Sequence, residues 1–162
     1  MKSRAIRLEE IVEAPAREVW AAWTTVEGLR TFLAPDARIE VRPGGRWEIL
    51  FEAAPEGSRG SEGCKVLEVA KGRVLVFEWN FPPWMPAIRD QRTRVTVEVH
   101  ALSDDQTLVA LEQAGWRDGK DWDAGFDYFA GAWSMVLARL ERSFRVGPID
   151  WSNPWRPPSD AC

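Results

Sequence analysis

Residues 121–144 read DWDAGFDYFAGAWSMVLARLERSF, and this stretch decides the fold. Its large apolar residues recur at intervals of three or four residues, which places them along one face of an α-helix. The stretch therefore predicts a single amphipathic helix of about six turns. The residues of this apolar stripe are Phe126, Phe129, Trp133, Leu137, Leu140 and Phe144.

The ends of this helix carry recognisable signals. Asp121 is the expected N-cap, because an aspartate side chain can accept a hydrogen bond from the first free backbone N–H groups. Arg139 and Arg142 fall in the last turns, where the helix dipole favours cations. We therefore predict one domain over residues 1–145 and an irregular tail over residues 146–162.

Upstream of the helix the sequence alternates between apolar and polar residues, which is typical of half-buried strands. Two short helical segments, 15–24 and 26–33, follow the first strand. Strands in hairpin succession beside segregated helices predict an α+β fold with an antiparallel sheet. We expect a seven-stranded sheet that curves around the long helix, because this arrangement buries both apolar faces. The predicted strands are residues 5–13, 37–42, 46–53, 61–70, 73–81, 92–102 and 106–114.

The composition excludes several classes of protein. The chain has 162 residues, with 21 Lys and Arg against 25 Asp and Glu, and its net charge of −4 argues against binding to nucleic-acid phosphates. No apolar run reaches the roughly 18 residues of a membrane span, and no secretory signal follows residues 1–4. We expect a cytoplasmic protein in which Cys64 and Cys162 are free thiols. His100 is the only histidine, so no metal site is expected.

Alternation along the strands assigns a set of aromatic side chains to the inner face of the sheet. One interpretation is a solid core, because aromatic stripes usually mean packing. The other is a cavity of a few hundred Å³ between sheet and helix that binds an apolar molecule. The predicted cavity walls are Trp47, Phe51, Phe77, Trp79, Phe81, Phe126, Phe129 and Trp133.

Two polar side chains share the inward parity of their strands. Glu10 lies between Leu8 and Val12, and Gln113 ends the last strand. A buried carboxylate and amide can orient a ligand by hydrogen bonds, and Glu10 is the first candidate for a general base. The other interpretation is that both lie at strand ends near solvent. His100 has outward parity, which argues against a catalytic role.

Residues 81–88, FPPWMPAI, are apolar and stiffened by proline although they fall in a predicted loop. Apolar residues in a loop need a reason. This segment either caps the core, gates a cavity or contacts another chain. We place Trp84 and Met85 at the mouth of the predicted cavity.

Several short motifs in this order point to a known family. They are Glu13-Ala14-Pro15, Val19-Trp20-x-x-Trp23-Thr24, Arg42-Pro43-Gly44-Gly45-Arg46-Trp47, Glu112-Gln113-Ala114-Gly115-Trp116 and Gly125-Phe126-x-x-Phe129-x-x-x-Trp133. Over about residues 4–145 the chain resembles START-like (SRPBCC) domains, and within them the AHSA-like branch, the homologues of the activator of heat-shock protein 90 ATPase. The resemblance implies a helix-grip fold with a cavity between the sheet and the long helix.

The sequence departs from this family in two respects. Thr31-Phe32-Leu33-Ala34-Pro35 stands where many members carry a Trp-Phe pair before the proline, which is expected to alter one wall of the pocket mouth. The separate N-terminal domain of the chaperone activator has no counterpart in this sequence, which argues against a co-chaperone role.

The leading hypothesis is a protein that holds a small apolar or amphipathic molecule in an interior cavity. Glu10 and Gln113 would orient that molecule, and no cofactor or metal is implied. Related domains include lipid and hormone binders, polyketide cyclases, ring-hydroxylase subunits and chaperone activators, so a shared fold does not select the function.

Two alternatives stay open. One is an enzyme of the cyclase or hydratase type in which Glu10 transfers a proton. The other is a chaperone-interaction module that uses the outer face and the 82–88 loop. A homodimer is a further possibility, whereas no nucleic-acid or membrane partner is expected.

Overall fold

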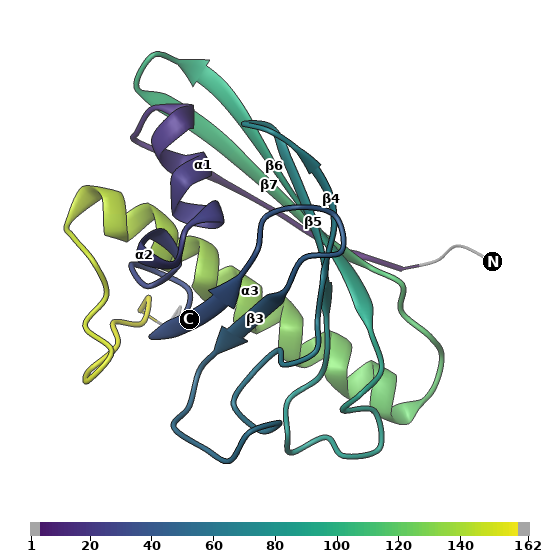
Figure 1. Cartoon of the computed structure of the whole chain (residues 1–162). Coiled ribbons are helices and arrows are strands. Elements are labelled where there is room, and N and C mark those ends of the chain that lie inside the picture. The colour runs from purple at the N-terminus through teal and green to yellow at the C-terminus, as the bar shows by residue number, and fades with distance from the viewer. Residues whose placement is uncertain (1–3, 159–162) are drawn as a thin grey trace.

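The structure is a computed structural model that describes residues 4–158, so the prediction for Cys162 lies outside the described residues. The helices and strands follow the predicted order, and the fold is α+β (Figure 1). The elements are β1 (Ile6–Val12), α1 (Ala16–Thr24), α2 (Val26–Leu29), β2 (Asp36–Ile39), β3 (Trp47–Leu50), β4 (Val66–Ala70), β5 (Val74–Trp79), β6 (Thr93–Ser103), β7 (Gln106–Ala114) and α3 (Lys120–Arg145).

The seven predicted strands are present, but they divide into two sheets. Five strands pair in the order β1-β7-β6-β5-β4, and β2 pairs with β3, all antiparallel. Backbone hydrogen bonds join β3 to the segment that leads into β4: the Trp47 N–H donates to the Cys64 carbonyl over 2.9 Å, and the Ser61 N–H donates to the Ile49 carbonyl over 2.9 Å. The predicted strand 61–70 begins only at Val66, because a turn at Gly63 (φ 86°) precedes it.

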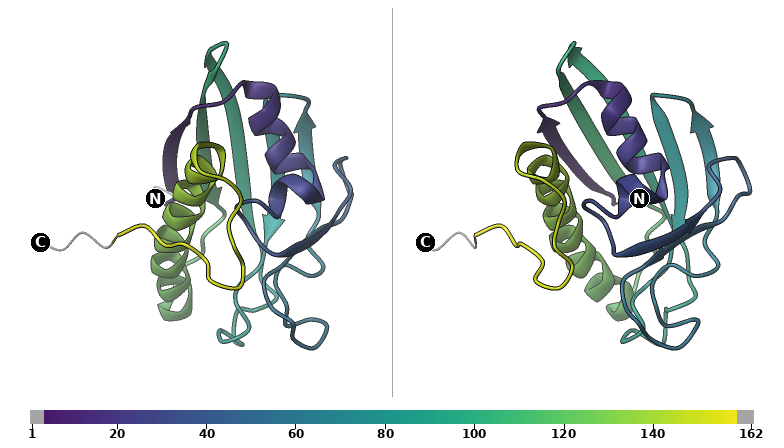
Figure 2. Two further views of the ribbon diagram at one scale, coloured as in Figure 1. Left: turned by 90° about the vertical axis from the view of Figure 1, so that its left-hand side faces the viewer. Right: turned by 60° about the vertical axis from the view of Figure 1, so that its left-hand side comes forward.

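The long helix α3 lies across one face of the five-stranded sheet, and α1 and α2 lie beside its C-terminal half (Figures 1 and 2). Its start differs from the prediction. The N-cap is Gly119, which has no side chain to cap the helix, and Asp121 lies in the first turn. Gly119 has a φ of 126°, a backbone conformation that favours glycine, so the helix begins earlier than the aspartate signal indicated.

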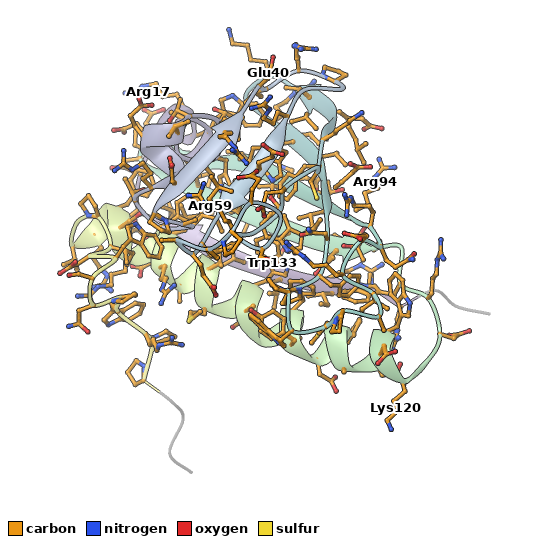
Figure 3. All side chains as sticks on the ribbon, turned by 60° about the horizontal axis from the view of Figure 1, so that its bottom comes forward. Arg17, Glu40, Arg59, Arg94, Lys120 and Trp133 are labelled. Atoms are coloured by element: carbon orange, nitrogen blue, oxygen red, sulfur yellow. The ribbon has the colours of Figure 1, made fainter. Side chains whose placement is uncertain are left out.

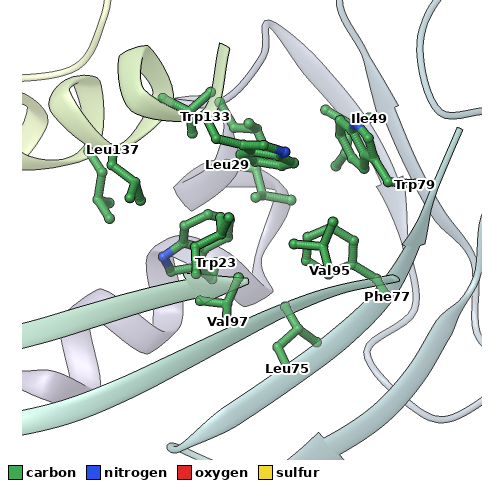
Figure 4. Packing of buried hydrophobic residues seen from close by; sticks show 14 of the residues in the cluster. Trp23, Leu29, Ile49, Leu75, Phe77, Trp79, Val95, Val97, Trp133 and Leu137 are labelled. Atoms are coloured by element: carbon green, nitrogen blue, oxygen red, sulfur yellow. The ribbon is translucent and has the colours of Figure 1, made fainter. Parts of the chain in front are cut away.

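The inward faces predicted from alternation form the core (Figure 4). Trp47 stacks on Phe77 with ring centroids 4.4 Å apart, and Trp79 lies 5.1 Å from Trp133 of α3. His100 is exposed, as its outward parity predicted.

The tail beyond α3 is irregular through residue 158, but it folds back on the domain. The Ile149 N–H donates to the Thr31 carbonyl over 2.9 Å, and the Trp151 indole donates to the Arg30 carbonyl over 2.6 Å. The Trp155 carbonyl accepts a hydrogen bond from Arg139. Trp151 and Trp155 therefore both contact the domain.

Two searches within residues 4–158 bear on the excluded classes. No helix there combines the length and the apolar character that crossing a membrane requires. No group of His, Cys, Asp and Glu side chains in that range is placed to hold a metal ion. Cys64 is a buried free thiol, and burial raises its pKa to about 12, so it stays protonated and unreactive at neutral pH.

Candidate functional site

A pocket of about 200 Å³ opens beside α3, at the end of β5 and under the loops that follow β3 and β5. It is open to solvent on one side and lies at one end of the space between the sheet and the helix (Arg59 and Trp133 of its lining are labelled in Figure 3). Six of the predicted ligand-binding residues line it. They are Phe51, Trp79, Phe81, Trp84, Phe129 and Trp133.

The inner wall of the pocket is held by a buried hydrogen-bond network. The Trp133 indole N–H donates to Oε1 of Gln113 over 2.9 Å, and Nε2 of Gln113 donates to the Thr93 hydroxyl over 2.8 Å. Thr93 in turn donates to the Trp79 carbonyl over 3.1 Å. Gln113 is fully buried and does not line the pocket. It is a positioning residue that fixes the Trp133 indole directly and the backbone of Trp79 through Thr93.

The mouth of the pocket is aromatic and exposed. Phe51, Trp84 and Tyr128 are 41%, 59% and 39% exposed, and Trp84 meets Tyr128 edge to face with centroids 5.5 Å apart. The proline-stiffened loop contributes to both wall and core, since Trp84 lines the pocket and Ile88 is buried. Sequence reasoning missed Tyr128, which precedes Phe129 and lies at the edge of the apolar stripe.

The other predicted wall residues lie elsewhere. Trp47 and Phe77 are stacked on each other inside the core and do not line the pocket. Phe126 packs against Trp116 with centroids 5.0 Å apart, and Met85 is partly buried against the core. The parity argument identified the inner face of the sheet but not which part of that face is filled.

Glu10, the weak catalytic candidate, is half-buried on β1 opposite Val109 of β7 and does not line the pocket. Burial and the nearby carboxylate of Glu141 both raise its pKa. Glu52 is the carboxylate that lines the pocket, and it is exposed. The pocket therefore presents no buried acid for proton transfer.

Polar residues also line the pocket, and sequence reasoning did not single them out. Arg89 donates to the backbone carbonyls of Phe81 and Gly57 and lies 3.5 Å from the Glu62 carboxylate. Burial opposes ionisation of Glu62, but backbone N–H groups of the 57–62 loop donate to it and lower its pKa. The ion pair and these hydrogen bonds fix the loop that roofs the pocket.

Arg139 is the most unusual of these residues. It is only 6% exposed, and burial and the neighbouring Arg156 both lower its pKa. Its Nε–H donates to the Trp155 carbonyl over 2.9 Å, and its guanidinium lies 5.6 Å from the Trp151 ring centroid. It pairs with no carboxylate among residues 4–158.

A sequence signal for Arg139 did exist. It follows Ala132 by seven residues and Val136 by three, which places all three on the pocket side of α3. The preference of the last helical turns for cations also explains an arginine at this position, and on that interpretation its side chain would be exposed. In the structure Arg139 is buried and lines the pocket. Leu33, from the segment that departs from the family pattern, also lines the pocket.

Solved structures with the same fold are numerous, and all of those described here are below 25% identity, so they show the fold alone. MLL2253 from Mesorhizobium loti is 24% identical, with 86% of this chain and 95% of that chain covered and a TM-score of 0.69. The Aha1 dimer from Colwellia psychrerythraea is 18% identical, with 89% and 98% covered and a TM-score of 0.68. CalU16 from Micromonospora echinospora is 20% identical, with 90% and 77% covered and a TM-score of 0.65.

Among curated proteins, none matches this chain. The sequence pattern of the family described as "Activator of Hsp90 ATPase homolog 1-like protein" matches residues 13–145. This match spans most of the chain and includes the pocket, the core network and the whole of α3. The chain therefore belongs to the family of activator of Hsp90 ATPase homolog 1-like proteins.

Proposed function

We propose that this protein binds a small, flat, apolar or amphipathic molecule in the pocket beside α3. The observation that carries the proposal is the lining, in which aromatic rings from β5, α3 and two loops surround one open volume. Rings of this kind supply large apolar area at fixed positions. The polar side chains at the roof add the few orienting groups that small-molecule sites need.

The size of the pocket limits the ligand. A cavity of about 150 Å³ lined by apolar side chains holds a benzene ring, whereas drug-sized ligands occupy pockets of about 300–1,000 Å³. The volume of about 200 Å³ therefore suits one ring or two fused rings with a small substituent. The exposed rings of the mouth extend the apolar surface for a longer substituent that protrudes.

A thermal-shift titration with the neutral probe 2-naphthamide tests this proposal. A ligand that binds the native state stabilises it, by about 2.7 kcal/mol when its concentration is a hundred times Kd. We expect the melting temperature to rise with probe concentration and to saturate. A melting temperature that stays constant up to the solubility limit of the probe would contradict the proposal.

A matched pair of variants locates the binding. Ala132→Leu projects a larger side chain into the pocket, so the affinity for 2-naphthamide should fall at least tenfold and the thermal shift should shrink accordingly. Ser134→Leu adds a similar volume on the exposed side of α3 and should leave the affinity unchanged. Equal effects of the two variants would place the binding outside the pocket.

Two other roles remain separate proposals. The family description supports a contact with Hsp90. The direct test is whether this protein stimulates the ATPase activity of the purified chaperone. One similar structure is described as a dimer, which supports a homodimer here, and sedimentation equilibrium tests it. Glu10, the residue proposed for proton transfer in the enzyme alternative, does not line this pocket.

A further inference from the structure

We infer that Arg139 is the anchor for an anionic group of the pocket ligand, so that the ligand is an aromatic or similarly flat carboxylate. This inference rests on the proposed function, because it assigns the chemistry of the molecule that the same pocket holds.

The first argument is the buried charge. A charged side chain is seldom as buried as Arg139, at 6% exposed, unless it is paired. Its Nη atoms are not among the fully buried unpaired polar atoms of residues 4–158, so they stay accessible to an incoming anion. Within residues 4–158 Arg139 makes one hydrogen bond, through Nε to the Trp155 carbonyl. A guanidinium has five N–H donors, so most of its donors have no acceptor in the described chain.

The second argument is the position of the guanidinium. Arg139 lines the pocket from α3, next to Val136 and one turn beyond Met135. The tail holds it there, since the Trp155 carbonyl accepts from Nε and the Trp151 ring lies 5.6 Å from it. The side chain is therefore fixed before any ligand arrives, which lowers the entropy cost of binding an anion.

The third argument is the charge of the lining as a whole. The chain carries a net charge of −4, yet three arginines and one glutamate line the pocket. Arg89 is compensated by Glu62, whereas Arg59 and Arg139 pair with no described carboxylate. A cleft with one sign of charge attracts ligands of the opposite sign.

The fourth argument is fit. The planar fork of arginine matches a carboxylate with two parallel hydrogen bonds. The aromatic rings of the pocket supply the surface for a flat apolar body. The two features together select a molecule that has a ring at one end and a carboxylate at the other.

Isothermal titration calorimetry with 2-naphthoate and 2-naphthamide tests the inference, because the two probes share their shape and differ in charge. Charge-assisted hydrogen bonds are worth about tenfold to a hundredfold in affinity. We expect the wild-type protein to bind 2-naphthoate tighter than 2-naphthamide by this factor. Equal affinities would overturn the inference and leave the proposed function intact, whereas binding of neither probe would overturn both.

Variants assign the preference to one residue. Arg139→Met keeps most of the apolar stem and should reduce the affinity for 2-naphthoate to that for 2-naphthamide, with 2-naphthamide little changed. Arg145→Met lies on the same helix, exposed and outside this pocket, and is the matched control. Loss of the preference in Arg59→Met, with Arg139→Met unaffected, would overturn the assignment to Arg139.

Two further arms complete the test. If Arg139→Met fails to fold, Arg139→Lys takes its place, because it retains the charge without the planar fork. Its preference for 2-naphthoate over 2-naphthamide should be weaker than that of the wild type but still present. Sodium acetate, which has the charge without the ring, should bind at least a hundredfold more weakly than 2-naphthoate. Equal binding of acetate would mean an anion site without a ring pocket and would overturn the inference.

Discussion

Gln113 shows how one buried side chain sets the geometry of the pocket. Its amide connects Trp133 of α3, whose ring lines the pocket, to Thr93 of β6, which lies behind it. Gln113→Leu would leave the Trp133 N–H without its acceptor, and a stranded buried donor costs about 1–3 kcal/mol. We expect urea denaturation to show a loss of this size.

The control for this prediction lies on the same strand. Gln106 donates to Glu13 at the surface, where water replaces the lost bond. Gln106→Leu should change the free energy of unfolding by less than about 0.5 kcal/mol. A comparable loss in both variants would show that the cost comes from the strand and not from the buried network.

The raised pKa of Glu10 predicts how the stability of the protein depends on pH. Its pKa in the folded state is raised by burial and by Glu141, so the folded protein binds this proton more tightly than the unfolded chain. The stability that depends on this group is therefore present at low pH and lost as the pH rises through the raised pKa. Glu10→Gln removes the penalty and should raise the melting temperature at pH 7.

The measurement is a series of melting temperatures between pH 4 and pH 8. The gain from Glu10→Gln should shrink as the pH falls toward the ordinary value of 4.5, because the wild-type carboxyl then becomes neutral as well. A gain that is the same at every pH would show that the effect does not come from ionisation of Glu10.

At the scale of the element, α3 carries two glycines with opposite surroundings. A Cβ atom at Gly125 would lie 2.5 Å from a ring carbon of Phe81, whereas a Cβ atom at Gly131 would meet nothing within 4 Å. Gly131→Ala should stabilise the protein by about 0.5–1 kcal/mol, because alanine is the better helix former. Gly125→Ala should destabilise it by about 1–3 kcal/mol, because the Phe81 ring must move.

Thermal unfolding of the two variants measures both effects in one helix. Equal stabilisation by both would mean that the Phe81 ring is free to yield. Destabilisation by Gly125→Ala with retained binding of 2-naphthamide would show that the helix packs tightly there while the pocket tolerates a small shift of Phe81, which lines it.

The elements show where sequence patterns are informative. Period-two alternation predicted the inner faces of β5, β6 and β7, because a packed sheet forces one parity inward. It could not separate Trp47 and Phe77, which lie in the core, from Trp79, which lines the pocket, since all three have the inward parity of their strands. It also missed Arg139, because amphipathic patterning treats every cation as exposed.

At the scale of the whole molecule, the residues after α3 are part of the folded unit. Ile149 is buried, and its backbone N–H donates to the carbonyl of Thr31, just after α2. Ile149→Ala should cost about 2 kcal/mol, because it leaves a gap among packed side chains. Val146→Ala, at a position that is 57% exposed, should cost almost nothing.

Chemical denaturation of both variants checks this. Equal and negligible effects would mean that residues 146–158 do not pack in solution as they do in the structure. The sequence predicted a tail for this segment because its prolines prevent regular structure. Irregular backbone can still dock through its tryptophans, and the periodicity of a sequence does not predict such contacts.

The pair of indoles at the inner wall of the pocket has a spectroscopic consequence. Trp79 and Trp133 lie 5.1 Å apart with their planes at 51°, a geometry in which the two excited states couple. Such coupling adds a paired positive and negative circular-dichroism band near 230 nm that has nothing to do with helix content. Trp116 and Trp122 form a second such pair, with ring centroids 6.1 Å apart. Trp133→Phe should therefore remove the part of this band that Trp79 and Trp133 contribute, while leaving the backbone signal in place.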